Sequence, residues 1–178
     1  GSIVFGILAA QLVNQKFFGR TFMRSILLFP YVGPVVALAY TWELLLDPYS
    51  GTLNNLLLNF QVIQEPLNLL GQKYLTINFF GFDLKLRLAL TTVIIFEIWR
   101  YFPLAFLFIL ARLQAIPKEL YEAADVDGAG PVQKFVSITL PQITAVISIL
   151  FMIRFIWNFN KFEDIFLLTG GASGTRTL

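Results

Sequence analysis

The residues that could carry chemistry are few, and they lie inside strongly apolar stretches. Arg154, Asn158 and Lys161 follow one another at spacings i, i+4 and i+7, so they share one face of a helix. Trp157 and Tyr101 lie in similar stretches and could add aromatic faces. Guanidinium, amide and ammonium groups beside aromatic rings suit the hydroxyls and ring faces of a sugar-like solute. The pattern predicts a polar path for a solute.

Few residue types in this chain could carry out catalysis. It contains no cysteine and no histidine, which excludes thiolate catalysis and cysteine-based metal sites and removes the commonest general base. An enzyme acting within a membrane would depend on carboxylates such as Glu97 or Asp164. No spaced pair of acids on one apolar stretch supports that chemistry.

The same charged residues also have a purely structural interpretation. Glu97 with Arg100, and Lys161 with Asp164, are spaced i, i+3, so each could be an ion pair that holds helices together. Arg154 could instead bind backbone carbonyls or extend its charge toward the membrane surface. The sequence leaves the structural and the functional interpretation open.

The composition is that of a membrane protein. Of the 178 residues, 57% are hydrophobic and 13% are charged, and the mean hydropathy is +0.71. Soluble domains average roughly 45–50% apolar and about 25% charged residues. So few charges would not keep a compact domain of this size in solution, which argues against an ordinary soluble enzyme, a disordered tail and a nucleic-acid-binding protein.

Four apolar segments are candidate spans, because a helix needs about 20 mostly apolar residues to cross roughly 30 Å of hydrocarbon. They cover residues 3–13, 22–46, 86–111 and 142–168. The first is short, and we expect it to belong to a longer span. Pro30 and Pro34 are expected to kink the second. We predict an all-α fold, a polytopic transmembrane helical bundle, as a single domain over residues 1–178.

Basic residues predict how the bundle is oriented. Three lie in the short loop after the first segment and three more in the connector 112–141. They are Lys16, Arg20 and Arg24, and Arg112, Lys118 and Lys134. The positive-inside rule places both regions in the cytoplasm. Residues 47–85 then form an external loop.

The connector 112–141 has a helical pattern of its own. Residues 118–126 are good helix formers with an acid in the first turn, and Gly128 and Gly130 end the pattern. Pro131 can open a second short helix, which we expect to end before Pro141. Two such helices at the membrane surface would suit insertion into a groove of a soluble partner. The simpler interpretation is a loop that only connects two spans.

The connector also resembles a known motif. Glu122-Ala123-Ala124, Gly128 and Leu140-Pro141 match the EAA loop of binding-protein-dependent ABC importer permeases. Residues 29–54 and 167–178 resemble other segments of the carbohydrate uptake branch. The chain is therefore similar, over nearly its whole length, to the first permease subunit of maltose-type or glycerol-phosphate-type systems. The resemblance implies a type I importer permease, of which this chain would be a fragment with about four of six or more spans.

The resemblance implies a role for the loop. In this family the EAA loop sits in a cleft of the ATPase subunit and conveys ATP-driven closure to the spans, which alternate between inward-open and outward-open states. The implied coupling residues are Tyr121, Glu122, Ala123, Ala124, Asp127, Gly128, Leu140 and Pro141. The chain has no G-x-x-x-x-G-K-[ST] motif. ATP and Mg²⁺ would therefore be bound by the partner ATPase, with no cofactor, catalytic residue or metal ligand in this chain.

Two further segments resemble those that frame the sugar in maltose-type permeases. Residues 157–162 resemble an N-F-N-N-F segment and residues 100–104 a G-F-P-Y segment. With the polar face described above they give the candidate substrate path: Arg100, Tyr101, Leu104, Arg154, Trp157, Asn158 and Lys161. Tyr101, Leu104 and Lys161 depart from the maltose-type pattern, which implies a different solute and a smaller or charged pocket.

Together these features predict a non-enzymatic permease subunit of an ATP-driven importer of a sugar or sugar-like solute, in the plasma (inner) membrane of a bacterium or archaeon. Its expected partners are a cytoplasmic ABC ATPase dimer, a second homologous permease subunit, an extracellular or periplasmic solute-binding protein, the solute and membrane lipid, but no nucleic acid. The alternative is a self-contained channel or ion-coupled transporter. Charged residues in the middle of the spans would serve that alternative. A channel or ion-coupled transporter would not, however, need two short helices that fit a groove of an ATPase.

Overall fold

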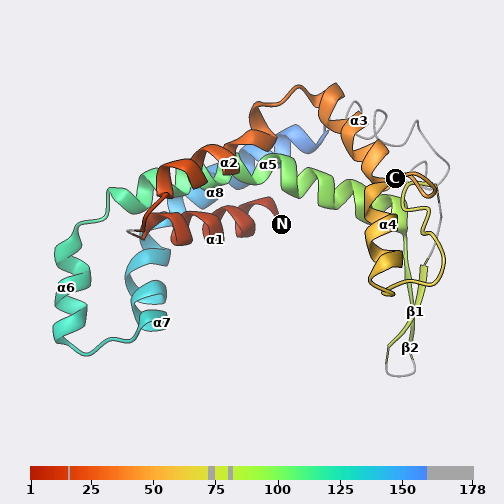
Figure 1. The fold of residues 1–178 in the computed structure, drawn as a ribbon. Coiled ribbons are helices and arrows are strands. Elements are labelled where there is room, and N and C mark those ends of the chain that lie inside the picture. Colours follow the sequence, from red (N-terminus) through yellow and green to blue (C-terminus); the bar gives the residue numbers. More distant parts are fainter. Residues whose placement is uncertain (16, 72–74, 80–81, 160–178) are drawn as a thin grey trace. The chain divides into compact units, whose positions relative to one another are not determined.

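The structure is a computed structural model that describes residues 1–178 except 16, 72–74, 80–81 and 160–178; for residues 75–86 it describes the backbone alone. Figure 1 shows the helices and strands in chain order. The chain divides into two compact units. Unit 1 comprises Gly1–Val32 and Ile98–Asn160, and unit 2 includes Gly33–Glu97.

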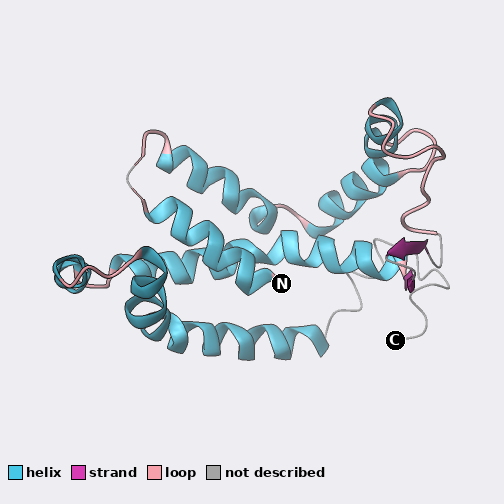
Figure 2. Ribbon diagram, turned by 90° about the horizontal axis from the view of Figure 1, so that it is seen from below, coloured by secondary structure: helices cyan, strands magenta, loops and turns pink. Residues whose placement is uncertain are grey.

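Unit 1 is built from long apolar helices. They are α1 (Ser2–Asn14), α2 (Arg20–Val32), the second half of α5 (Leu88–Gln114) and α8 (Leu140–Phe159). In Figure 2, α8 lies on one side of this part of α5 and α2 on the other. The core is drawn from α1, α5 and α8, and its fully buried side chains include Phe106, Ile109 and Ile143.

The contact of α1 with α5 depends on small residues. A Cβ added at Gly6 would lie 2.6 Å from the Cβ of Ala105 and 2.9 Å from the backbone nitrogen of Phe106. The two backbones approach this closely because Gly6 and Ala105 have little or no side chain. Small residues at helix contacts are typical of proteins within a membrane, where close van der Waals packing drives helix association.

Unit 2 contains the residues that were predicted to form an external loop. They form α4 (Thr52–Asn59) and the antiparallel strands β1 (Leu75–Phe79) and β2 (Phe82–Leu86), with Leu75 opposite Leu86. The unit also holds α3 (Val35–Leu46) and the start of α5. The all-α fold class is confirmed, with this one short hairpin as an addition that the sequence did not predict.

A buried asparagine ties this region together. The side-chain amide of Asn54 donates to the carbonyl oxygens of Asp47 at 3.2 Å and Leu67 at 3.0 Å, and its Oδ1 accepts from the N–H of Leu67 at 3.0 Å. The carboxylate of Asp47 accepts from the backbone N–H and hydroxyl of Ser50 and from the N–H of Tyr49. These bonds, first among them the one from the Ser50 backbone, hold the pKa of Asp47 below its ordinary value.

The second apolar segment differs from the single kinked helix that we expected. It forms two helices, α2 and α3, with a break at Gly33 and Pro34. Pro34 is extended, with φ −61° and ψ 132°, and it precedes the first residue of α3. Proline disfavours helical geometry in the residue before it and has no N–H to donate. Pro30, by contrast, stays inside α2.

Among the described residues, two helices are long and apolar enough to cross a membrane, Leu88–Gln114 and the continuous run Pro131–Phe159. The broken pair α2 and α3 would make a third span, and α1 is apolar but shorter. The expectation of about four crossings stays a prediction, as do the single domain 1–178, the cytoplasmic connector 112–141 and the external loop 47–85.

The connector contains α6 (Lys118–Val126) and α7 (Pro131–Lys134), as the sequence predicts. The prediction that the second short helix ends before Pro141 is wrong. The chain continues through a π-helical turn, Phe135–Thr139, directly into α8. The N–H of Leu140 bonds to the carbonyl of Phe135, five residues back. A wider turn of this kind relieves the clash that a proline ring makes with the preceding turn, so the helix runs through Pro141.

Candidate coupling helices and polar cluster

Most residues of the helix α6 are exposed. None of its residues is buried; Glu122 and Ala123 are exposed, and Ala124 is half-buried. In Figure 1, α6 and α7 stand at one end of unit 1. We call α6, the turn after it and α7 the coupling helices.

Gly128 determines how α6 ends. Its φ is +72°, a left-handed conformation that glycine adopts without the strain of a Cβ. The N–H of Ala129 donates to the carbonyl of Ala124 at 2.8 Å, and the N–H of Gly128 donates to that of Asp125 at 3.1 Å. This pair of bonds is the Schellman motif. Asp127, the C-cap residue, is exposed beside it.

Side chains attach the coupling helices to the start of α8. The hydroxyls of Tyr121 and Thr139 lie 2.8 Å apart and share a hydrogen bond, with Thr139 buried in the π-helical turn. Lys134 forms an ion pair with Asp125. Both contacts join α6 to the α7–α8 run.

A third attachment joins α5 to α8. The Nε of Arg112 donates to the carbonyl of Gln142 at 3.0 Å, and a terminal guanidinium nitrogen donates to Oε1 of the same residue at 2.6 Å. Leu140 is half-buried and Pro141 exposed next to this contact. The end of α5 and the start of α8, between which the coupling helices lie in the chain, are therefore joined directly to each other.

The end of α1 lies at the same end of unit 1. A groove of about 230 Å³ has a mixed polar and apolar lining of Gln11, Asn14, Gln15, Leu113, Tyr121, Pro131, Lys134, Phe135 and Thr139. The loop after α1 and the coupling helices therefore share one end of the unit. Which side of a membrane the two basic regions face stays a prediction.

A second group of predicted residues meets at Tyr101. The guanidinium carbon of Arg154 lies 4.0 Å from the centre of the Tyr101 ring, and that of Arg100 lies 5.1 Å from it. The rings of Trp157 and Tyr31 have their centres 6.3 Å from that of Tyr101. We call Arg100, Tyr101, Arg154, Trp157 and Tyr31 the aromatic–arginine cluster.

Four of the seven predicted path residues thus belong to one cluster that spans α5 and α8. Leu104 packs against the core of unit 1, and Asn158 is exposed on α8 beside Trp157. Lys161 and Asp164 lie outside the described residues, so their predicted pairing stays a prediction. The predicted pairing of Glu97 with Arg100 stays a prediction as well.

Sequence reasoning missed Tyr31, Thr139 and Gln142. The only sequence signal for Tyr31 is a tyrosine next to Pro30 within an apolar segment. Thr139 and Gln142 show no distinctive spacing, because their partners Tyr121 and Arg112 are 18 and 30 residues away. Among the described residues, no group of three or more acids could hold a metal ion.

The family model of the binding-protein-dependent transport system inner membrane component matches residues 2–177. The chain belongs to this family. Its fold is that of an ABC importer permease, since it superposes on a chain of a bacterial ABC transporter involved in the import of the acidic polysaccharide alginate. That match has a TM-score of 0.69 and 25% identity, and it covers 97% of this chain and 58% of the other.

Curated members of the family are similar in sequence. The inner membrane ABC transporter permease protein YcjO of Escherichia coli (strain K12) is 38% identical over 169 residues, which are 95% of this chain and 54% of that protein. The trehalose/maltose transport system permease protein MalF of Thermococcus litoralis is 35% identical, over 98% of this chain and 54% of that protein. The glycerol-3-phosphate permease protein UgpA of Yersinia pestis is 32% identical, over 99% and 55%. The chain spans about half the length of these relatives.

Proposed function

We propose that this chain is part of a permease subunit that imports a sugar or sugar-like solute across the inner membrane, driven by a separate ATPase. Membership of the binding-protein-dependent family supports this function, as do the relatives named for trehalose, maltose and glycerol 3-phosphate transport. The observation that carries the proposal is the exposed coupling helix α6, attached to α8 through Tyr121 and Thr139. The chain itself performs no catalysis in this proposal.

In the proposed mechanism, α6 and α7 insert into a groove of the ATPase. Glu122 and Ala123 are exposed for that contact, and Ala124 allows close approach. Gly128 and Asp127 shape the turn between the two short helices. Movement of the ATPase would reach α8 through the Tyr121–Thr139 and Asp125–Lys134 contacts and then through Leu140 and Pro141. ATP acts through the partner by favouring one of two arrangements of the spans.

The aromatic–arginine cluster is the proposed solute path. Trp157 is 39% exposed and can stack against a sugar ring. Arg100 and Arg154 lie against Tyr101, and Asn158 is exposed on the adjacent turn, so the region offers hydrogen-bond donors to hydroxyl or phosphate oxygens. Leu104 supports this part of α5 from the core side, and Lys161 remains a path residue by sequence alone.

The remaining partners follow from the family. We expect a second permease subunit, an ATPase dimer that binds ATP and Mg²⁺, and a solute-binding protein outside the membrane. A structurally similar transporter has been crystallised with an alginate pentasaccharide-bound periplasmic protein, in a match with a TM-score of 0.70. The alternative of a self-contained channel or ion-coupled carrier has no comparable support.

Uptake by the reconstituted complex tests the proposal. The full-length permease and its partners are placed in vesicles and offered maltose, trehalose or glycerol 3-phosphate, with and without ATP. We expect ATP-dependent uptake of one of these solutes, with maltose the least favoured because Tyr101, Leu104 and Lys161 depart from the maltose-type pattern. Uptake that continues without ATP or without the ATPase would instead establish the channel or carrier.

The same assay tests the path. Trp157→Leu and Asn158→Ala should raise the solute concentration needed for half-maximal uptake by about tenfold, which is the effect of losing one good stacking or hydrogen-bonding contact. Ile156→Ala is the matched control, since Ile156 is exposed on the same helix. If all three variants have equal effects, the aromatic–arginine cluster is not part of the solute path.

A further inference from the structure

One polar contact closes the part of the chain that contains the coupling helices. Arg112 lies in the last turn of α5 and Gln142 in the first turn of α8, and residues 113–141 between them include α6 and α7. The guanidinium donates to the backbone carbonyl of Gln142 at 3.0 Å and to its side-chain oxygen at 2.6 Å. We call this pair the basal contact. Because the planar fork of arginine engages two acceptors at once, it fixes the orientation of the two helix ends as well as their distance.

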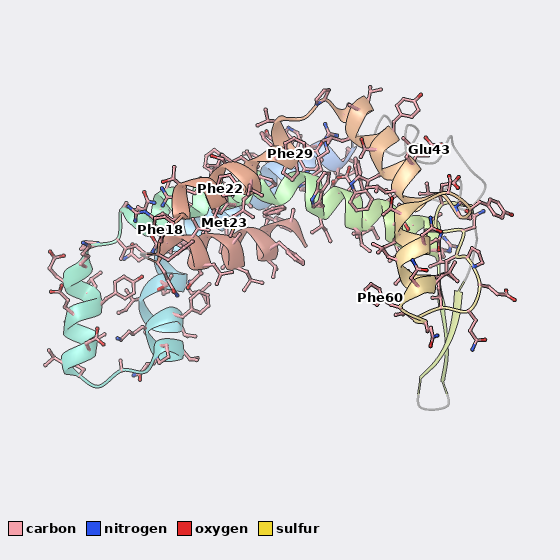
Figure 3. All side chains as sticks on the ribbon, in the orientation of Figure 1. Phe18, Phe22, Met23, Phe29, Glu43 and Phe60 are labelled. Atoms are coloured by element: carbon pink, nitrogen blue, oxygen red, sulfur yellow. The ribbon has the colours of Figure 1, made fainter. Side chains whose placement is uncertain are left out.

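The attachments of α6 lead first to α8. The helix has no buried residue, and in Figure 3 its ribbon stands apart from those of the long helices. The hydrogen bond of Tyr121 with Thr139 and the ion pair of Asp125 with Lys134 attach it to the run that begins α8. Neither of these two polar contacts involves α5. The basal contact is the next polar link, from the start of α8 to the end of α5.

The same two helices carry the aromatic–arginine cluster. The guanidinium carbon of Arg154 on α8 lies 4.0 Å from the ring centre of Tyr101 on α5. Each of these residues is roughly 17 Å along its helix from the basal contact, at 1.5 Å per residue. The fully buried side chains of Phe106 and Ile143 belong to the core between the two levels. Because closely packed interiors transmit strain, a movement of one helix end against the other would reach the cluster.

We propose that Arg112 is a positioning residue for transport: through the basal contact it makes the ends of α5 and α8 move together when the ATPase moves the coupling helices. The movement then reaches the aromatic–arginine cluster from both helices. Without the contact, the start of α8 moves away from α5, and ATP is hydrolysed with little uptake. This inference rests on the proposed function. It extends that function to a pair outside the EAA motif, since neither Arg112 nor Gln142 is one of the motif residues.

The number of solute molecules taken up per ATP hydrolysed tests this role. The full-length permease and its partners are placed in vesicles with maltose, trehalose or glycerol 3-phosphate, whichever the wild type takes up. Arg112→Gln should lower the ratio about threefold or more, because hydrogen bonds from a charged group are among the stronger ones. The solute concentration for half-maximal uptake should stay at the wild-type value, since the buried core still holds the cluster when the ATPase is at rest. A residue with only a structural role would change the amount of complex and not this ratio.

Further variants separate the geometry of the contact from its charge. Arg112→Lys keeps the charge but not the planar fork, and Gln142→Ala removes one of the two acceptors, so both should lower the ratio by a smaller factor. Gln142→Glu keeps a side-chain acceptor and should retain the wild-type ratio. The matched controls are Arg20→Gln and Gln114→Ala, at exposed residues of unit 1, and both should behave like the wild type.

The results that overturn the inference differ from those that overturn the proposed function. Wild-type uptake that needs no ATP overturns the proposed function and the inference with it. ATP-dependent wild-type uptake with an unchanged ratio in Arg112→Gln or Arg112→Lys overturns the inference alone, as does an equal fall in the Arg20→Gln control. If Arg112→Gln fails to assemble, Gln142→Ala must still lower the ratio and Gln142→Glu must not, because alanine and glutamate are both good helix formers at this position in α8.

Discussion

The hydroxyls of Tyr121 and Thr139, 18 residues apart in the chain, lie 2.8 Å apart and join the exposed helix α6 to the π-helical turn that leads into α8. Thr139 is buried, whereas α6 has no buried residue. This contact is therefore a narrow link between the surface that we assign to the ATPase and a helix long enough to span the membrane.

Removal of one hydroxyl from this link tests it. Tyr121→Phe leaves the ring in place and should cost roughly 1 kcal/mol of stability, the usual net value of one hydrogen bond. Solute uptake per ATP hydrolysed should fall several-fold, because α6 then moves with less effect on α8. Thr139→Val should behave alike and Thr139→Ser should retain the wild-type ratio. Reconstituted vesicles measure both rates, and an unchanged ratio in Tyr121→Phe would contradict the link.

The turn after α6 permits a comparison of two glycines. A Cβ at Gly128 or at Gly130 would meet no atom within 4 Å, but φ is +72° at Gly128 and −70° at Gly130. Gly128→Val should cost roughly 1–2 kcal/mol of backbone strain, distort the coupling helices and uncouple uptake from ATP hydrolysis while the subunit still inserts. Gly130→Ala should stay within about 0.5 kcal/mol of the wild type. Normal solute-stimulated uptake by Gly128→Val would count against the coupling role.

The sequence predicted α6 to the residue, and it placed the polar residues that meet at Tyr101. Helix propensity and a glycine end are local signals, which is why α6 was predicted. The i, i+4 spacing with Asn158 pointed to Arg154, although Asn158 is not in the cluster, and the family resemblance pointed to Arg100, Tyr101 and Trp157. The contacts of Tyr121 with Thr139, and of Arg112 with Gln142, depend on how distant helices pack, and no local pattern encodes them. The run of α8 through Pro141 was missed because a π-helical turn has no signature in the sequence.

Asn54 should be critical for the structure of unit 2. Asn54→Ala leaves the polar groups of Leu67 and Asp47 without their partner and should cost about 2–3 kcal/mol locally. Asn55→Ala, at an exposed neighbour, should be near neutral. Limited proteolysis of residues 47–71 in the purified protein measures the difference, and equal cleavage rates in the two variants would contradict this role.

The absence of cysteine makes the orientation testable with single thiols. Val126 is 89% exposed and Tyr49 is 88% exposed, so Val126→Cys and Tyr49→Cys present matched side chains. Each variant is made in a full-length protein without other cysteines and treated with a membrane-impermeant thiol reagent. The reagent should label Tyr49→Cys in cells in which only the outer membrane is permeabilised. It should label Val126→Cys only after the inner membrane is permeabilised too. The reverse pattern would invert the topology and place α6 away from any ATPase.

The central claim is that the coupling helices bind an ATPase subunit, and a pull-down tests it most directly. The full-length, affinity-tagged permease is purified from its native membrane and its companions are identified by mass spectrometry, for the wild type, Glu122→Lys and the control Glu65→Lys in the predicted external loop. We predict that an ATPase and a second permease subunit copurify with the wild type and with Glu65→Lys, and that Glu122→Lys loses the ATPase alone. A wild-type permease that is recovered only with itself, or a Glu122→Lys variant that retains the ATPase in full, would contradict the account.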